Sequence, residues 1–293
     1  MRIDHFAIGV DDLERAVAWY RDVIGLREVG ERDGRRFLGC GGRPQFDLAI
    51  EEGSPGLRHV AYGCFSEEAF AAAAQRLRAS GLDEAPVRAL GPGVADAVAA
   101  RLPGGHVVQV VRREGVDAYV SVAHWGPDAA LSPRDIDHVN IAVQDVDATV
   151  AALDRALGLR LSDLHHVEGH GNVGAWMRAG DRHHDFAIIR NRADGLHHIA
   201  YQLADAAAMI AFADRLASAG TTAEYGVGRH GPGSNLFLYA RDPSGNRVEL
   251  TADMAAVPEG APHRVWEGRD PAIVNSIAPY GPPRAFWEIT AAA

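Results

Sequence analysis

The chain of 293 residues contains the same sequence pattern twice. Residues 3–27 share 11 identities with residues 136–160 at a constant offset of 133, and both segments begin with Ile-Asp-His. The match resumes further along the chain in two segments: 56–62 against 195–201, and 102–109 against 242–249. Since an internal repeat marks two copies of one structural unit, a single irregular domain of this length is excluded.

The repeat divides the chain into four parts. We expect a first repeat over 1–120, a linker over 121–134, a second repeat over 135–255 and a C-terminal arm over 256–293. The arm contains Trp266, Tyr280, Phe286 and Trp287. Two roles for it remain open: packing over the functional site or a neighbouring subunit, or simply covering core surface.

The sequence predicts an order of strands and helices in each repeat. A strand over 3–10 leads into an amphipathic helix that begins at Asp11 or Asp12 and stops at Gly25. A second helix is predicted over 67–80, and strands are predicted over 46–50, 59–63 and 107–111. The order strand, helix, strand, strand, strand occurs about twice per repeat. We therefore expect an α+β protein in which tandem βαβββ modules form two half-open barrels with the helices outside.

The composition argues against several classes of partner. The net charge is −10 with a pI of about 5.7, and no basic cluster stands out, so nucleic acid and anionic membranes are poor partners. No apolar stretch approaches the roughly 20 residues of a membrane helix, and the N-terminus does not have the pattern of a signal peptide. Cys40 and Cys64 are expected to be buried thiols, which fits a cytoplasmic protein.

Histidine is concentrated in the second half of the chain: ten of the 14 histidines lie from His138 onward, nine of them in the second repeat. Strand alternation puts His138, His198 and Glu249 on the polar faces of three strands. Two imidazoles and a carboxylate are the facial triad of non-haem iron(II) oxygenases, although three such ligands also suit catalytic zinc. The first repeat keeps His5 and His59 but has Gln109 in place of the carboxylate, which predicts a decayed metal site.

These motifs resemble the two-domain extradiol ring-cleavage dioxygenases of the vicinal oxygen chelate superfamily. The resemblance covers nearly the whole chain, and it includes the His-His-Ile-Ala-Tyr strand that starts at His197 and the Asp-Pro-Ser-Gly-Asn-Arg-Val-Glu-Leu segment that starts at Asp242. The spacings of 60 residues from His138 to His198 and 51 from His198 to Glu249 are typical of that family. The fold expected from this resemblance is the glyoxalase/bleomycin-resistance/dioxygenase-like fold.

The resemblance also implies roles for single residues. It implies that His138, His198 and Glu249 hold iron(II), with manganese(II) as an alternative. It further implies an acid–base histidine at His184, rather than His183, and substrate-oxygen partners at His230 and Tyr239. The first repeat has Phe46 and Ala99 at the positions of His184 and Tyr239.

Two residues bear on the substrate pocket. Trp176 resembles a pocket residue of the homoprotocatechuate branch, but Tyr225 stands where that branch has a carboxylate-binding arginine, which argues against an acidic substrate. His165, His166 and His170 flank a Gly-rich stretch, and we expect them to be loop or surface residues.

The predicted activity is extradiol cleavage of a small aromatic diol by dioxygen, in the degradation of aromatic compounds, by a homo-oligomeric enzyme. The residues leave three rivals: a glyoxalase-type isomerase with a site built from both repeats, a non-catalytic small-molecule binding protein, and a zinc hydrolase.

Overall fold

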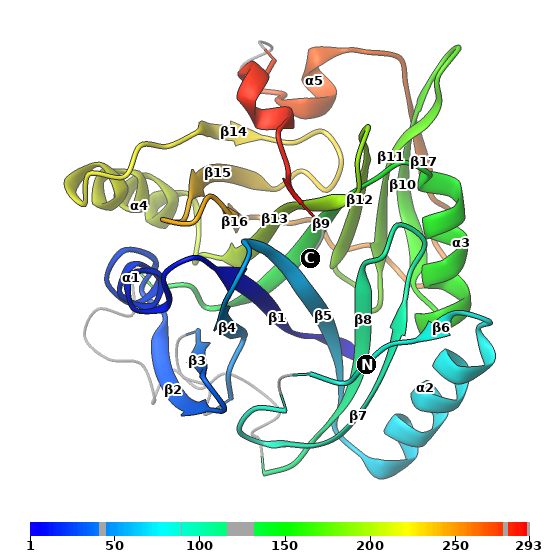
Figure 1. The fold of residues 1–293 in the computed structure, drawn as a ribbon. Coiled ribbons are helices and arrows are strands. Elements are labelled where there is room, and N and C mark those ends of the chain that lie inside the picture. Colours follow the sequence, from blue (N-terminus) through cyan, green and yellow to red (C-terminus); the bar gives the residue numbers. More distant parts are fainter. Residues whose placement is uncertain (41–44, 89, 116–131, 278–280, 292–293) are drawn as a thin grey trace.

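The computed structural model describes residues 1–293 except 41–44, 89, 116–131, 278–280 and 292–293. Two curved sheets, one from each repeat, lie one above the other, and the longer helices cover their outer sides (Figure 1). The predicted linker over 121–134 falls outside the described residues except for its last three positions.

The order of elements is strand, helix, strand, strand, strand, twice in each repeat, as the sequence predicts. The first repeat comprises β1 (Arg2–Val10), α1 (Leu13–Trp19), a π-helical turn (Tyr20–Ile24), β2 (Arg27–Arg32), β3 (Arg35–Gly39), β4 (Leu48–Glu52), β5 (Gly56–Cys64), α2 (Glu67–Ala79), β6 (Asp83–Glu84), β7 (Val94–Arg101) and β8 (Val107–Arg113). The second repeat comprises β9 (Asp135–Val143), α3 (Val146–Leu157), β10 (Arg160–Val167), β11 (Gly171–Arg178), β12 (Phe186–Arg190), β13 (Gly195–Gln202), α4 (Ala206–Ser218), β14 (Tyr225–Arg229), β15 (Leu236–Arg241) and β16 (Arg247–Ala252). The α+β class with tandem βαβββ modules is confirmed.

The first helix of each repeat is set by the same local chemistry. The carboxylate of Asp12 accepts a hydrogen bond from the amide of Arg15, and Asp145 caps α3 in the same way. The helical segments end at Gly25 and Gly158, whose φ angles of 87° and 68° lie in the left-handed region that glycine adopts without strain.

The central strands of the second sheet carry the predicted ligands. The described part of this sheet has the order β14-β15-β16-β13-β9-β12-β11-β10-β17. Strand β13 runs antiparallel to β9 and parallel to β16, so these three strands are direct neighbours. Side chains that point to the same face of the three strands are therefore brought together in the middle of the sheet.

The two repeats share one hydrophobic core, which holds their sheets in a fixed relation. Polar contacts cross the same boundary: Tyr62 Oη donates to Asp185 Oδ1 at 2.6 Å, and Tyr20 Oη donates to Asp242 Oδ2 at 3.1 Å. Cys40 and Cys64 are buried free thiols, as expected. Within the described residues, no helix is long and apolar enough to cross a membrane.

The described part of the C-terminal arm adds two strands to the second sheet. It comprises β17 (Arg264–Glu267), α5 (Pro271–Val274), a 3-10 turn (Arg284–Trp287) and β18 (Thr290–Ala291). Strand β17 pairs in parallel with β10, and β18 pairs with β13 in the antiparallel direction. Between these strands the arm passes over the second repeat at the top of Figure 1.

Candidate active site

Three predicted ligands converge on the face of the second sheet. His138 on β9 and His198 on β13 have their Nε2 atoms 3.0 Å apart, and each Nε2 lies 2.9 Å from Glu249 Oε2 on β16. All three side chains are buried. They are the one group of three or more His, Cys, Asp or Glu residues in the described chain whose donor atoms are close enough to share an ion.

The spacing of these atoms tests which coordination geometry they fit. Donor atoms on one face of a six-coordinate ion lie about 3.0 Å apart if the metal–ligand distance is about 2.1 Å. The corners of a tetrahedral zinc site with similar bonds lie about 3.4 Å apart. The observed 2.9–3.0 Å separations fit the facial arrangement. In addition, neither oxygen of buried Glu249 accepts a well-aligned hydrogen bond from the described residues, which suits a carboxylate that binds a cation.

Mutual electrostatics shift the pKa values of the three groups. Burial by itself would raise the pKa of Glu249, but His138 and His198 hold that pKa well below its usual range. Burial also opposes protonation of His138, but the carboxylate of Glu249 raises the pKa of this imidazole to about 9. Burial lowers the pKa of His198 to about 4. Glu249 is therefore ionised at neutral pH, as a metal ligand must be.

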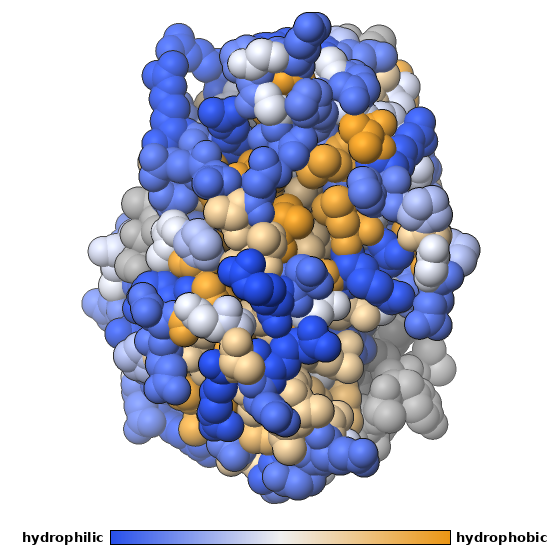
Figure 2. Space-filling model, turned by 90° about the vertical axis from the view of Figure 1, so that its right-hand side faces the viewer, coloured by the Kyte–Doolittle hydropathy of each residue, from blue (hydrophilic) through white to orange (hydrophobic). Residues whose placement is uncertain are grey.

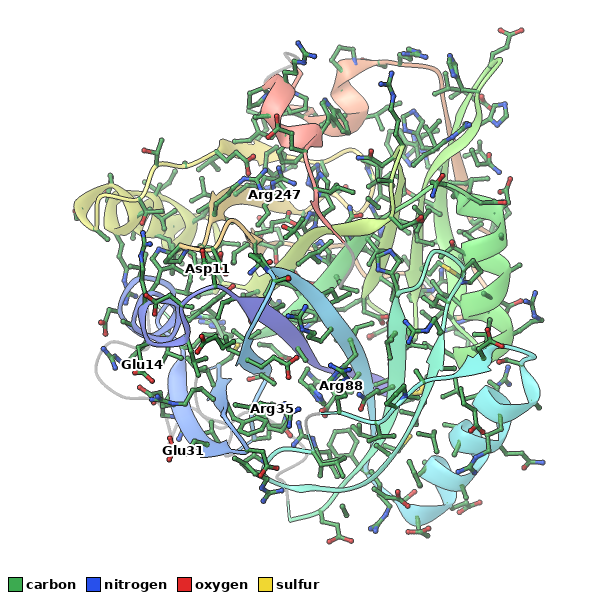
Figure 3. All side chains as sticks on the ribbon, in the orientation of Figure 1. Asp11, Glu14, Glu31, Arg35, Arg88 and Arg247 are labelled. Carbon is green, nitrogen blue, oxygen red and sulfur yellow. The ribbon has the colours of Figure 1, made fainter. Side chains whose placement is uncertain are left out.

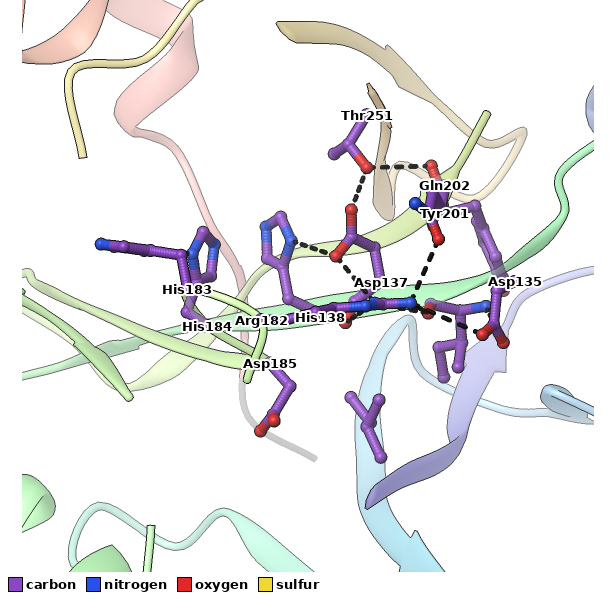
Figure 4. Close-up of polar contacts among 12 residues, drawn as sticks. Asp135, Asp137, His138, Arg182, His183, His184, Asp185, Tyr201, Gln202 and Thr251 are labelled. Carbon is purple, nitrogen blue, oxygen red and sulfur yellow. Dashed lines mark hydrogen bonds and ion pairs between the residues drawn. The ribbon is translucent and has the colours of Figure 1, made fainter. Parts of the chain in front are cut away.

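A polar network supports the strand that carries His138 (Figure 4). Arg182 Nη1 donates to Asp137 Oδ1 at 3.1 Å, and the hydroxyl of Thr251 donates to Asp137 Oδ2. The Nδ1 atom of His138 lies 3.8 Å from Asp137 Oδ1. This network holds the strand segment just before the ligand, and sequence reasoning missed Arg182 because it lies outside every motif.

A register shift in β13 places two consecutive histidines on the cavity side. The pairing between β13 and β9 slips between Leu196 and His198, which interrupts the strict alternation of side chains. His197 Nδ1 consequently lies 2.7 Å from His198 Nδ1, and His197 Nε2 lies 3.1 Å from the carbonyl of Phe286 in the arm. Arg247, labelled in Figure 3, donates to the carbonyl of His197 at 3.1 Å. Strict alternation along the strand would put His197 on the face opposite to His198.

The structure places His184 at the site and His183 behind it. The ring centroid of His184 lies 4.4 Å from that of His138, and burial lowers the pKa of His184 well below its usual range. His184 Nδ1 lies 3.0 Å from His183 Nδ1, and His183 Nε2 lies 3.1 Å from Asp163 Oδ2. His184 is therefore a neutral imidazole whose orientation is held through His183 and Asp163.

His230 and Tyr239 form a second polar pair at the site. Tyr239 Oη lies 3.0 Å from His230 Nε2, and His230 Nδ1 donates to the carbonyl of Val274 in the arm at 2.7 Å. Because Nδ1 carries the proton, Nε2 accepts the hydrogen bond from the tyrosine hydroxyl. Tyr239 is directly opposite Glu249 in the pairing of β15 with β16, which explains its place beside the ligands.

A cavity of about 550 Å³ opens onto these residues. Its described lining comes entirely from the second repeat and the arm, and Trp176 is part of it, whereas Tyr225 is not. His165 and His166 were expected to be loop or surface residues, but both are half-buried residues of β10, and His165 lines the cavity. His170 lies in the turn beside this strand, as expected, and also lines the cavity. Apolar side chains reach the surface in the upper, second-repeat half of the face in Figure 2.

The equivalent place in the first repeat keeps part of this geometry. The Nε2 atoms of His5 and His59 are 3.0 Å apart, like those of the second-repeat pair. Gln109 pairs with Ala61 of β5 in the same register in which Glu249 pairs with Ala200 of β13. The ring centroids of Phe46 and His5 are 4.5 Å apart. Phe46 thus lies against His5 as His184 lies against His138.

Comparisons with known proteins agree with this architecture. The family model for the Glyoxalase/Bleomycin resistance protein/Dioxygenase superfamily matches residues 2–110 and 135–250. Metapyrocatechase 2 from Cupriavidus necator is 32% identical over 96% of this chain and 88% of its own length. The manganese-dependent 2,3-dihydroxybiphenyl 1,2-dioxygenase from Geobacillus genomosp. 3 is 28% identical over 85% of this chain and 84% of its own.

Solved structures show the same fold. Homoprotocatechuate 2,3-dioxygenase from Brevibacterium fuscum, in complex with 3,4-dihydroxyphenylacetate, superposes with a TM-score of 0.87 at 22% identity, covering 99% of this chain and 92% of that one. The 2,3-dioxygenase LapB from Pseudomonas sp. KL28 gives a TM-score of 0.83 at 22% identity over 91% and 96% of the two chains. The resemblance inferred from the sequence is thus confirmed, and the chain belongs to the Glyoxalase/Bleomycin resistance protein/Dioxygenase superfamily.

Proposed function

We propose that this protein cleaves a catechol ring next to its diol, using dioxygen and a mononuclear non-haem metal ion held by His138, His198 and Glu249. The observation that carries the proposal is the facial spacing of the three ligand atoms at 2.9–3.0 Å, beneath an open cavity that His184, His230 and Tyr239 also line. In the reaction one carbon–carbon bond of the ring breaks, and both oxygen atoms of dioxygen enter the product.

The ion would supply chelation of the diol, which favours loss of its protons, and would bring the diol and dioxygen together. We propose iron(II), with manganese(II) as the alternative, since the ligand set suits both and one relative is named as manganese-dependent.

The side chains around the ligands would transfer protons and form hydrogen bonds with the substrate. His184 is neutral and is held through Nδ1, so its Nε2 is the atom that would take a proton and return it. The Tyr239 hydroxyl gives its proton to His230 Nε2, so its oxygen would accept a hydrogen bond from a diol hydroxyl, and the bond from His230 Nδ1 to Val274 keeps the imidazole in place.

The rival functions fit the geometry less well. The spacing of the ligand atoms is shorter than that of a tetrahedral zinc site, which disfavours the hydrolase. An isomerase site built from both repeats is disfavoured because the described cavity lining begins at His138 and includes nothing from the first repeat. A non-catalytic binding protein would not require the polar side chains of His184, His230 and Tyr239 beside the ligands.

The test is anaerobic reconstitution with iron(II), followed by catechol, 3-methylcatechol or 2,3-dihydroxybiphenyl and air. We expect oxygen uptake together with a yellow ring-cleaved product, both absent in Glu249→Ala and both retained in the matched first-repeat variant Gln109→Ala. Iron-loaded protein that consumes no oxygen with any of these diols would contradict the proposal.

A further inference from the structure

The cavity is much larger than a single aromatic ring requires. Its volume is about 550 Å³, whereas an apolar cavity of about 150 Å³ suffices to bind benzene. Once a diol ring is seated at His138 and His198, most of the cavity remains available for another part of the substrate.

The remaining space is bordered by apolar side chains from two parts of the molecule. One wall is formed by β10 and β11, where Val167, Val173 and Trp176 line the cavity. The arm contributes Ile273 and other apolar side chains to the lining. Water is released from an apolar group that enters this space, and such burial is favourable in proportion to the area covered.

The Arg and Asp side chains of the described lining are confined to the rim. They are Arg190, Arg269 and Asp270, and all three are exposed. The guanidinium of Arg190 donates to the carbonyl of His170, and Asp270 stands next to Arg269 in the chain. A carboxylate in the part of the cavity away from the metal ligands would therefore be desolvated without a buried arginine to pair with, which is costly.

The first repeat shows what a charged wall looks like in the same fold. Ile189 pairs with Ala142 and Gly174 in the second sheet, and the equivalent positions in the first sheet belong to Glu51 and Arg35. Glu51 forms ion pairs at 2.8 Å with both Arg35 and Arg58. The second repeat has an apolar side chain and a glycine where the first has this ion-pair network, so its wall is open and uncharged.

We propose that the substrate is a catechol extended by an apolar group of about the size of a second ring, rather than an unsubstituted or a carboxylated catechol. This inference rests on the proposed function for the diol part of the substrate. The apolar part rests on the cavity alone, which allows the two to be tested separately.

Binding to metal-free protein tests the cavity without turnover. Titrations of 2-hydroxybiphenyl and of phenol, followed by tryptophan fluorescence or calorimetry, should give a dissociation constant at least tenfold lower for 2-hydroxybiphenyl. Val173→Asp, which adds a charge to the wall, should remove most of that difference. The same change at exposed Val265 on β17, which does not line the cavity, should preserve it.

Turnover by iron-loaded protein tests the whole substrate. We expect kcat/KM for 2,3-dihydroxybiphenyl to exceed that for catechol and for 3,4-dihydroxyphenylacetate by at least tenfold. Equal binding of phenol and 2-hydroxybiphenyl, or a preference for either smaller or acidic diol, would overturn the inference. Selective binding of 2-hydroxybiphenyl without turnover of any diol supports the apolar cavity and contradicts the oxygenase proposal instead.

Discussion

The two repeats have the same fold and the same histidine pair, but only the second repeat combines this pair with a carboxylate ligand and with polar residues around it. In both, two imidazole Nε2 atoms lie 3.0 Å apart on neighbouring antiparallel strands. The second repeat adds Glu249, whereas the first has Gln109, whose Nε2 donates to the carbonyl of Arg88 at 3.1 Å. The fold by itself therefore delivers the histidine pair, and the chemistry depends on what a few register-equivalent positions carry.

The charged groups around the two histidine pairs also differ. In the first repeat His5 Nδ1 lies 2.7 Å from Asp4 Oδ2, and Arg113 neutralises that carboxylate at 2.6 Å. Arg35 and Arg88, labelled in Figure 3, add positive charge to this half of the molecule. A divalent ion there would meet two imidazoles and the amide of Gln109 in place of a carboxylate, so the first repeat lacks a complete ligand set.

The largest expected effect comes from making the second repeat resemble the first. Glu249→Gln keeps the shape of the side chain but removes the charged ligand. Because changes to the partners of metal ligands already cost about 10–100-fold in metal affinity or activity, loss of a ligand itself should lower ring cleavage by about 10³-fold or more. Metal content after dialysis and oxygen uptake measure this, and a variant that keeps its ion and half of its activity would refute the ligand assignment.

His184→Phe copies Phe46 of the first repeat and should separate catalysis from metal binding. His184 touches the ring of His138 without being a ligand, so the ion should remain bound. Acid–base residues typically contribute about 10²–10⁴-fold, and we expect kcat to fall by about 10²-fold or more. Full turnover in the variant, or loss of the metal with turnover, would show that His184 has a different role.

Much of this comparison can be predicted from the sequence, because it depends on patterns among residues that are close together in the chain. The repeat and strand alternation predict the tandem modules and the strands of His138, His198 and Glu249, and the caps at Asp12 and Gly25 follow from known helix chemistry. These features depend on residues close together in the chain.

The features that sequence reasoning missed depend on long-range pairing. The register shift that turns His197 toward the cavity arises between β13 and β9, which are about 60 residues apart. The contacts of the arm with His197 and His230 join segments separated by 89 and 44 residues. No periodic pattern encodes such contacts, so the sequence left open whether the arm packs over the site or only covers core surface; in the structure it forms part of the cavity lining.

Buried His59 makes the stability of the protein depend on pH. Burial lowers its pKa well below the usual value, while the unfolded chain still titrates near pH 6.5. Below that pH the unfolded state binds a proton that the folded state does not, so stability falls as pH decreases. His59→Gln should reduce the loss of unfolding free energy between pH 7 and 5.5 by about 1 kcal/mol in urea titrations. The control is His263→Gln, at an exposed position in the arm, which should leave the loss unchanged.

The smallest expected change is a gain of metal without a gain of activity. Gln109→Glu would place a carboxylate beside His5 and His59, in the register that Glu249 has beside the second pair. Bound metal should rise from about one ion per chain toward two, since the new set has the two-histidine, one-carboxylate donors of a facial metal site. Ring cleavage should stay constant, because Phe46 and Ala99 supply neither a proton nor a hydrogen bond. Elemental analysis of the dialysed protein, paired with Glu249→Gln in the same chain to empty the second repeat, gives the occupancy of the new site directly. If the stoichiometry does not change, the arginines around the first repeat, rather than the missing carboxylate, are what exclude the ion.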